Sequence, residues 1–243
     1  MMNKQSELMT STEPKKVLMF FLKVISVLLI VNLLGIISNF GLGHGHLFGL
    51  IPLTNFDTES NIPTLYSFLT LLIAAILLVI IGFREKKINH NWSSWIFLAL
   101  VFLYLAIDEG SAYHEKWIEV IRTTLDTTGI FYFAWVIPYA ILGIVLLLTY
   151  LRFIMALPAR TRKLFILAGS IFVSGAIGFE MLSGIIAASY NTNTIFYALL
   201  TTGEELLEMI GIALFNYALL DYHVNQHGEL RFTVTGSQTN LSA

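Results

Sequence analysis

The stretch SSWIFLALVFLYLAIDEGSAYHEKW, Ser93 to Trp117, decides what kind of fold this chain can adopt. It is apolar up to Ile107 and then places three carboxylates and a histidine within eight residues, at Asp108, Glu109, His114 and Glu115. A helix of about 20 apolar residues, rising 1.5 Å per residue, crosses a hydrocarbon core of about 30 Å. The stretch therefore predicts a membrane helix with an acidic end.

Apolar blocks of this length recur along the whole chain. Of its 243 residues, 56% are hydrophobic and only 12% are charged, and the mean hydropathy is +0.74. These values lie far from those of water-soluble domains. The sequence predicts an all-α, polytopic integral membrane helical bundle of about six transmembrane helices, over residues 17–39, 63–83, 93–115, 131–153, 164–188 and 194–220.

The basic residues predict the orientation of this bundle. If both termini lie on one side, every Lys and Arg except Lys116 and Arg122 lies on that side or close enough to reach it. Basic loops stay in the cytoplasm, so both termini are expected there. The predicted organisation is a cytoplasmic tail over 1–16, one transmembrane domain over 17–221 and a second cytoplasmic tail over 222–243, in a bacterial plasma (inner) membrane.

The residue types that are missing narrow the possible chemistry. The chain has no cysteine, which excludes disulfides, thiolate metal sites, iron–sulfur clusters and covalently attached haem c. It also lacks the GxSxG elbow, the Walker loop and the HExxH zinc motif. The topology already explains the basic loops, so no nucleic-acid partner is expected; the bilayer is the expected partner.

Seven acidic residues gather towards the non-cytoplasmic half of three predicted spans: Asp108, Glu109, Glu115, Glu180, Glu204, Glu205 and Glu208. A carboxylate near the bilayer centre costs about 2.5 to 3.5 kcal/mol on insertion scales. No Lys or Arg lies in the outer half of any predicted span. The charges must therefore be neutralised by bound protons, by a metal cation or by water in an open cavity.

Helical spacing places these acids on particular faces. Asp108, Ser111 and Glu115 are expected on one face of the third span, with His114 beside them. Thr201, Glu204, Glu205 and Glu208 follow one face of the sixth span. In the fifth span, Glu180 continues a stripe of mostly small residues, which lets membrane helices approach closely: Gly169, Val173, Ala176, Ser183, Gly184 and Ala187.

A divalent metal site is the sharpest hypothesis for this cluster. Carboxylates and imidazole suit iron, manganese or zinc, and carboxylates on neighbouring helices build two-metal sites in helical bundles. The Glu-x-x-His motif of such bundles is absent, since Glu205-x-x-Glu208 has the spacing without the histidine. The expected metal ligands are Asp108, Glu180, Glu204, Glu208 and His114. The expected catalytic residues are His114, as ligand or general base, Glu115 and Glu205.

Other histidines and other functions stay open at this point. His44 and His46 lie in the first outer loop and could approach a metal. His223 and His227 are expected to be solvated residues of the cytoplasmic tail, and His90 belongs to an inner loop. The cluster could serve an enzyme acting on a lipid-like or other hydrophobic substrate. It could equally serve a cation- or proton-coupled transporter, or a non-catalytic subunit or sensor, in an oligomer or with a partner subunit.

Overall fold

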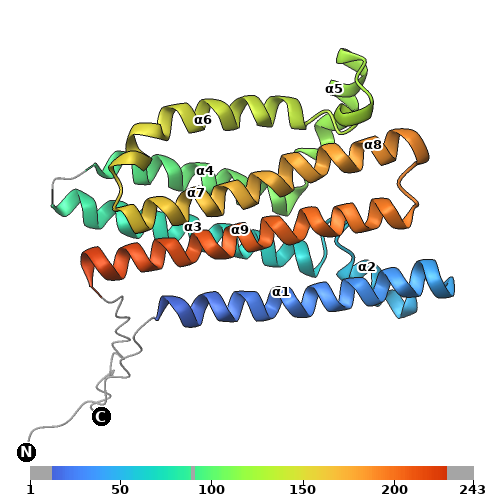
Figure 1. Cartoon of the computed structure of the whole chain (residues 1–243), viewed down its shortest axis with the longest axis horizontal. Coiled ribbons are helices and arrows are strands. Elements are labelled where there is room, and N and C mark those ends of the chain that lie inside the picture. Colours follow the sequence, from blue (N-terminus) through green and yellow to red (C-terminus); the bar gives the residue numbers. More distant parts are fainter. Residues whose placement is uncertain (1–12, 89–90, 229–243) are drawn as a thin grey trace, which may run out of the picture.

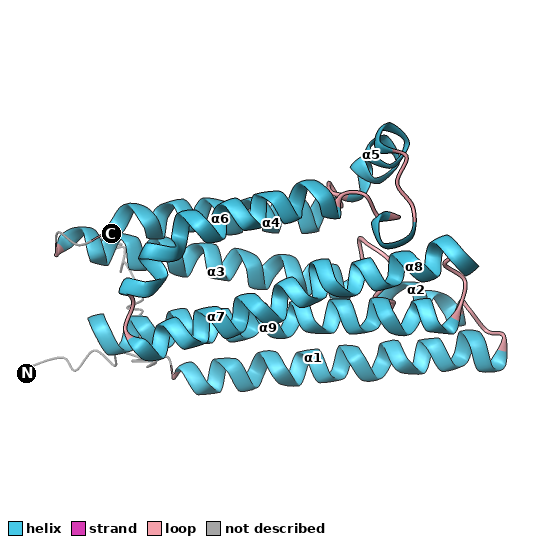
Figure 2. Ribbon diagram, turned by 45° about the horizontal axis from the view of Figure 1, so that its top comes forward, coloured by secondary structure: helices cyan, strands magenta, loops and turns pink. Residues whose placement is uncertain are grey.

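The computed structural model describes residues 13–88 and 91–228, which form helices and connecting turns without any strand. The long helices run side by side along one axis (Figures 1 and 2). They are α1 (Pro14–Ile36), α3 (Ile62–Lys87), α4 (Trp92–Ser111), α6 (Val136–Ala156), α7 (Ala159–Val173), α8 (Glu180–Tyr190) and α9 (Ile195–His227). Short helices α2 (Leu50–Thr54) and α5 (Ile118–Leu125) lie at one end of the bundle. The expectations for His90 and for most of the two tails fall outside the described residues.

The all-helical prediction is confirmed, with five segments long and apolar enough to cross a membrane within the described residues. They are Pro14–Gly41, Ile62–Lys87, Trp92–Ser111, Val136–Ala156 and Ala159–Tyr190. The sixth predicted span corresponds to α9, which is long enough but carries Glu204, Glu205, Glu208 and Asp221. Helix α9 packs against α1, α3, α7 and α8. Its acids are therefore enclosed by the apolar helices around it.

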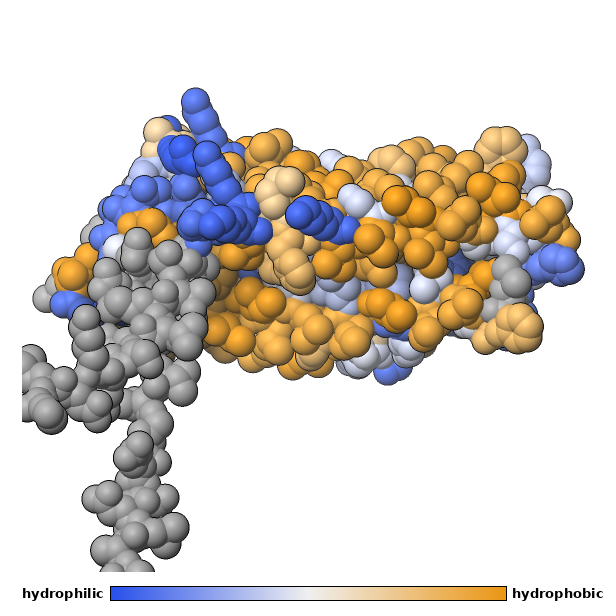
Figure 3. All heavy atoms as spheres, turned by 90° about the horizontal axis from the view of Figure 1, so that it is seen from below, coloured by the Kyte–Doolittle hydropathy of each residue, from blue (hydrophilic) through white to orange (hydrophobic). Residues whose placement is uncertain are grey.

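The outer surface of the bundle is apolar over most of its length (Figure 3). Leu148, Phe20 and Phe97 are 67%, 61% and 54% exposed. A water-soluble protein rarely exposes such a large continuous apolar surface. Basic side chains gather where α1 begins, α3 ends and α6 joins α7, which we call the basic end (Figure 1): Lys15, Lys16, Arg84, Lys86, Lys87, Arg160, Arg162 and Lys163. The opposite end is called the acidic end.

A hydrophobic cluster fills the half of the bundle nearer the basic end. Leu78, Ile81 and Leu219 are fully buried there, and the aromatic rings of Phe102 and Phe215 stack at a centroid distance of 4.5 Å. Trp95 is also part of this cluster, at 1% exposure. In the described part of the chain, this close packing puts apolar side chains between the acidic-end half of the α3–α9 interface and the basic end.

A π-helical segment, Ser174–Phe179, joins α7 to α8 and changes which face of the helix is buried. The predicted small-residue stripe is therefore only half right. Glu180, Ser183, Gly184 and Ala187 are buried, whereas Gly169 and Val173 are exposed. Each turn of a π-helix holds more residues than an α-turn, so an α-helical period counted back from Glu180 points to the wrong face.

The close contact between this π segment and α9 depends on a glycine. A Cβ atom built on Gly175 would lie 2.7 Å from the backbone oxygen of Glu204 and 3.1 Å from Cγ of Glu208. Any larger residue would push the two helices apart. Gly175 therefore sets how near α9 lies to Glu180.

Helix α4 ends earlier than the sequence predicts. The expected span reaches residue 115, but α4 stops at Ser111 because Ala112 adopts a left-handed conformation with φ of 46°. The backbone N–H of Tyr113 then bonds to the carbonyl oxygen of Asp108 at 3.2 Å. Asp108 and Glu115 consequently do not share a helical face; instead, the turn folds His114 back over Asp108.

Candidate metal centre

A cavity opens between the acidic-end halves of α3, α4 and α9 and is closed on its remaining sides by α6 and the α7–π segment. About 80 Å³ of it is open to the centres of water-sized molecules, enough for several waters or hydrated ions. Its polar lining comprises Glu59, Ser67, Thr70, Asp108, Glu109, His114, Trp135, Tyr139, Glu204, Glu205 and Glu208. Leu71, Leu105, Phe172, Met209 and Ile212 are among its apolar walls.

Asp108 holds His114 in a defined orientation. Its Oδ1 accepts a hydrogen bond from the backbone N–H of His114 at 3.0 Å, and its Oδ2 lies 3.1 Å from Nδ1 of the same residue. An ionised carboxylate only accepts, so the proton of a neutral imidazole resides on Nδ1 and Nε2 keeps its lone pair. Metal-binding histidines are held in this way by a carboxylate on the second ring nitrogen. Asp108, predicted as a metal ligand, thus lies in the position of an orienting group.

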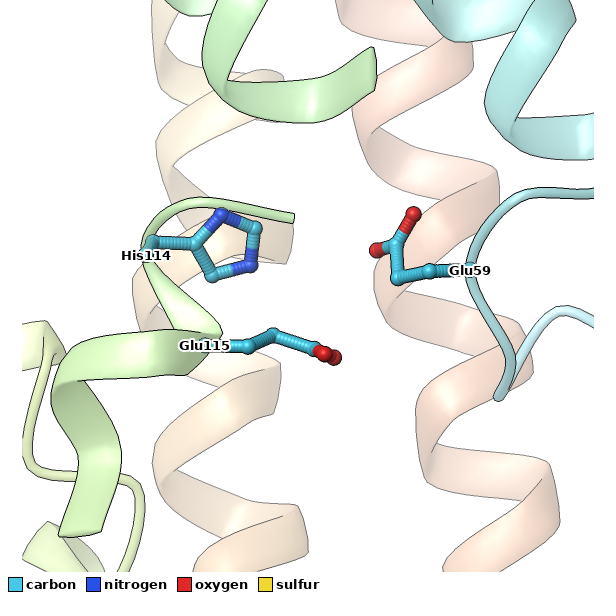
Figure 4. A group of neighbouring side chains, drawn as sticks. All are labelled: Glu59, His114 and Glu115. Atoms are coloured by element: carbon cyan, nitrogen blue, oxygen red, sulfur yellow. The ribbon is translucent and has the colours of Figure 1, made fainter. Parts of the chain in front are cut away.

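His114, Glu59 and Glu115 come from different parts of the chain and point towards one another (Figure 4). Each offers one ligand atom, and these atoms lie within 4.8 Å of each other. Glu59 belongs to the turn before α3, where Thr64 Oγ1 donates a 3.0 Å hydrogen bond to its Oε2. A cation between the three groups would receive one imidazole nitrogen and two carboxylates, a donor set suited to iron, manganese or zinc.

Three further carboxyl groups lie deeper in the cavity, on α4 and α9. Glu109, Glu205 and Glu208 line it and are near enough to interact electrostatically with each other and with Glu59. Glu205 and Glu208 are three residues apart on α9, so both side chains face the same way. These groups add three carboxyl groups to the cavity, but their oxygens are not among the ligand atoms that lie within 4.8 Å of one another in the described residues.

Glu180 and Glu204 form a separate buried pair beside the cavity. Trp135 Nε1–H donates a 2.7 Å hydrogen bond to Glu180 Oε1, and Ser183 Oγ lies 3.3 Å from Glu180 Oε2. The two carboxyl groups also lie close enough to interact with each other, and a proton on one of them relieves the repulsion between them. Glu204 Oε2 is buried and has no hydrogen-bond partner among the described residues. Because Glu204 lines the cavity, this oxygen can accept a bond from a group inside it.

The cavity has a strong excess of negative groups. The described lining residues include no Lys or Arg. Burial raises the pKa of Glu59 above its ordinary value, the hydrogen bond from Thr64 opposes this, and the carboxylate of Glu115 adds to it. Burial lowers the pKa of His114, but the hydrogen bond and charge of Asp108 outweigh that effect, and the pKa rises. Both groups therefore hold protons more firmly than they would in water.

Most of the residues singled out from the sequence meet at this one place. His114, Asp108, Glu204, Glu205 and Glu208 line the cavity, Glu115 reaches its rim, and Glu180 joins through Glu204. Sequence reasoning missed Glu59, Trp135 and Tyr139 as members of the site. Nothing in the sequence separates Glu59 from the other loop acids, because only the fold of the turn before α3 brings it opposite His114.

The remaining histidines lie elsewhere. His44 and His46 are exposed in the loop after α1 and do not belong to the group of ligand atoms around His114. The expectation of solvated histidines at the end of α9 is wrong: His223 is 1% exposed, and His227 Nε2 lies 2.8 Å from Glu85 Oε1. Helix α9 continues to His227 and packs these residues against α3.

The fold and the site together define a class: an all-helical bundle with an apolar exterior that encloses a carboxylate- and histidine-lined cavity. Over residues 21–222 the chain matches the family model described as a domain of unknown function, DUF8692. The chain belongs to this family. No curated protein and no solved structure matches it.

Proposed function

We propose that this protein is a membrane-embedded, metal-dependent enzyme whose site opens at the acidic end of the bundle and accepts a lipid-like or otherwise hydrophobic substrate. In this proposal α9 is a sixth membrane-spanning helix, shielded by the apolar segments around it. Both termini and the basic end are cytoplasmic, because Lys and Arg concentrate there.

The observation that carries the metal proposal is the unbalanced charge of the cavity. Six of its lining residues are acidic, Glu59, Asp108, Glu109, Glu204, Glu205 and Glu208, and the described lining has no Lys or Arg. Burying unpaired carboxylates costs several kcal/mol each. Protons could neutralise them singly, but one divalent cation would neutralise several at once and would meet an imidazole whose Nδ1 is held by Asp108 and whose other nitrogen faces two carboxylates.

The donor groups suggest two neighbouring cation positions. The first would use His114, Glu59 and Glu115, and the second Glu109, Glu205 and Glu208. Helical bundles hold pairs of iron or manganese ions with carboxylates from facing helices in this manner. Zinc is compatible with the first position.

The closure of the cavity favours an enzyme over a carrier. A carrier needs polar access to its site from both membrane faces. Here Leu78, Ile81 and Leu219 fill the path from the cavity to the basic end. The lining residues Glu59 and His114 come from the turns at the acidic end, which is the side from which a substrate would enter.

The residues of the site have distinct roles in such an enzyme. A divalent cation bound here would acidify a coordinated water or polarise an oxygen of the substrate. Asp108 keeps the imidazole of His114 in one tautomer. With one proton between them, Glu180 and Glu204 would provide a carboxylic acid and a carboxylate that can give and take a proton beside the cavity.

Metal analysis tests the proposal first. Protein purified in detergent without chelators is expected to contain iron, manganese or zinc, measured by elemental mass spectrometry. Glu205→Gln/Glu208→Gln should lose at least one equivalent while keeping its melting temperature and elution volume. Glu119→Gln on α5, which is exposed, is the matched control. Folded wild-type protein with no metal at the acidic end would overturn the metal proposal.

Side-specific labelling separates enzyme from carrier, because the chain has no natural cysteine. Glu115→Cys, exposed at the rim of the cavity, is expected to react with a membrane-impermeant thiol reagent added to the outer face only. Ala218→Cys, fully buried in the hydrophobic cluster, should react from neither face. Labelling of the Ala218 variant from the cytoplasmic face, in folded protein, would favour the carrier.

A further inference from the structure

A second group of buried ionisable side chains lies at the basic end, between α3 and α9. It consists of Glu85, His223 and His227, with Tyr222 beside them. The hydrophobic cluster around Leu78 and Leu219 separates it from the cavity at the acidic end. The function proposed above makes no use of this group.

Glu85 and His227 are already in contact. His227 Nε2 lies 2.8 Å from Glu85 Oε1, and the side chains are 8% and 2% exposed, respectively. Tyr222 donates a hydrogen bond of 2.8 Å to the same carboxylate oxygen. The hydroxyl group of Tyr222 thereby fixes the orientation of the carboxylate that faces His227.

His223 is the unexplained member of the group. It is 1% exposed, and neither ring nitrogen has a hydrogen-bond partner among the described residues. Its ring centroid lies 5.5 Å from that of His227, one helical turn further along α9. The imidazole is therefore buried beside His227 with ring nitrogens that can bind a ligand.

We propose that Glu85, His223 and His227 form a zinc site that fastens the end of α9 to α3. Two histidines four residues apart on a helix face the same way and bind one metal ion together. With a carboxylate from a neighbouring segment they make the His₂Glu donor set found in mononuclear zinc sites, where a water takes the fourth position. Tyr222 then acts as the outer partner that orients the carboxylate ligand.

Glu85 and His227 already meet, but the ligand atoms of all three residues do not yet lie within 4.8 Å of one another, so binding of the ion requires His223 to move towards this pair. Ligand atoms that surround a zinc ion tetrahedrally at about 2.0 to 2.2 Å lie roughly 3.3 to 3.6 Å apart. The present separation of 2.8 Å between His227 Nε2 and Glu85 Oε1 is slightly shorter, as expected where a proton stands in for the ion.

Zinc titration of the full-length chain in detergent tests this proposal. The Glu59→Gln/Glu205→Gln/Glu208→Gln variant serves as the background, because it removes ligands from both cation positions proposed in the cavity at the acidic end. After chelator treatment this protein is expected to bind one equivalent of Zn²⁺. Adding His223→Gln should weaken that binding by at least about 100-fold, whereas His44→Gln, an exposed histidine, should leave it unchanged.

Cobalt provides a readout that a merely structural role of His223 would not change. Co²⁺ in a four-coordinate nitrogen–oxygen site gives a visible absorption band, which should appear in the background protein and vanish in His223→Gln and in His227→Gln. Melting temperatures measured without metal show whether each variant is folded. A folded background protein that binds no Zn²⁺, or a cobalt band that persists in both histidine variants, would overturn the proposal.

These experiments distinguish a failure of the zinc site from a failure of the metal centre at the acidic end. Loss of all metal with His223→Gln, and none with Glu205→Gln/Glu208→Gln, would leave the zinc site standing and refute the metal centre at the acidic end. The opposite pattern would refute the zinc site alone.

Discussion

Asp108 and His114 are joined twice, because Oδ1 of Asp108 accepts from the backbone N–H of His114 at 3.0 Å while Oδ2 meets Nδ1 at 3.1 Å. One carboxylate therefore fixes both the turn after α4 and the imidazole that the turn carries. The orientation of the His114 ring at the acidic end depends on this pair. It is formed by residues six positions apart, but only because Ala112 reverses the chain.

Asp108→Asn should weaken metal binding by about 10- to 100-fold, as expected when the orienting partner of a histidine ligand is lost. The amide can donate to Nδ1 and so favour the tautomer with the proton on Nε2, where the metal would bind. Competition with a metal-sensitive dye measures the change. Unaltered affinity in a folded Asp108 variant would show that this pair does not orient a ligand.

Glu59→Gln should weaken metal binding by more than about tenfold, although it keeps the shape of the side chain and can still accept from Thr64. The reason is the loss of a charged ligand opposite His114. Asp57→Asn removes a charge from the same turn but not from the cavity lining, and is the matched control. Equal effects of the two substitutions would indicate a general electrostatic influence instead of ligation.

Metal-free protein should lose stability as the pH rises from about 5 to 8. Glu59 and His114 both have pKa values raised by folding, so the folded state binds their protons more tightly than the unfolded state. That contribution is complete below the unfolded pKa values and disappears as the pH passes the folded ones.

Metal-loaded protein should respond in the opposite direction, because the cation must displace these protons. The gain in melting temperature on adding Mn²⁺ or Zn²⁺ is therefore expected to grow between pH 5 and 8. Melting curves with and without metal across this range measure both effects. A metal-dependent gain that shrinks with rising pH would contradict ligation by Glu59 and His114.

Gly175→Ala should destabilise the protein by about 1 to 3 kcal/mol. The added methyl group would lie 2.7 Å from the carbonyl oxygen of Glu204 and force the π segment away from α9. Gly169→Ala, on the same continuous helix but with nothing within 4 Å of the new atom, should be neutral or slightly stabilising. Thermal unfolding in detergent compares them, and equal melting temperatures would rule out the close contact.

Trp135→Phe should cost about 1.5 to 3 kcal/mol, because it removes the indole N–H that donates to Glu180 at 2.7 Å while keeping an aromatic ring. Trp92→Phe, at a residue that is 40% exposed, provides the comparison. If Trp135→Phe and Trp92→Phe have the same melting temperature, the hydrogen bond to Glu180 contributes nothing to stability.

The amino-acid sequence by itself determined the helices and the level at which the acids lie. Both are local properties. The length and hydropathy of a segment predict a helix, and a rise of 1.5 Å per residue gives how far along the helix axis each acidic residue lies. Asp108, Glu180, Glu204 and Glu208 could thus be grouped before any contact was known. The absence of basic residues near them pointed to protons or a cation for the same reason.

Only the tertiary structure decided which groups face one another. The π segment before Glu180 shifts the buried face of its helix, and the left-handed residue after Ser111 turns His114 back onto Asp108. Glu59 enters from a turn far away in the sequence, and His223 is buried because α9 continues along α3. Helical periodicity assumes an unbroken α-helix, so it cannot anticipate a change of register, a reversal of the chain or a contact between distant segments.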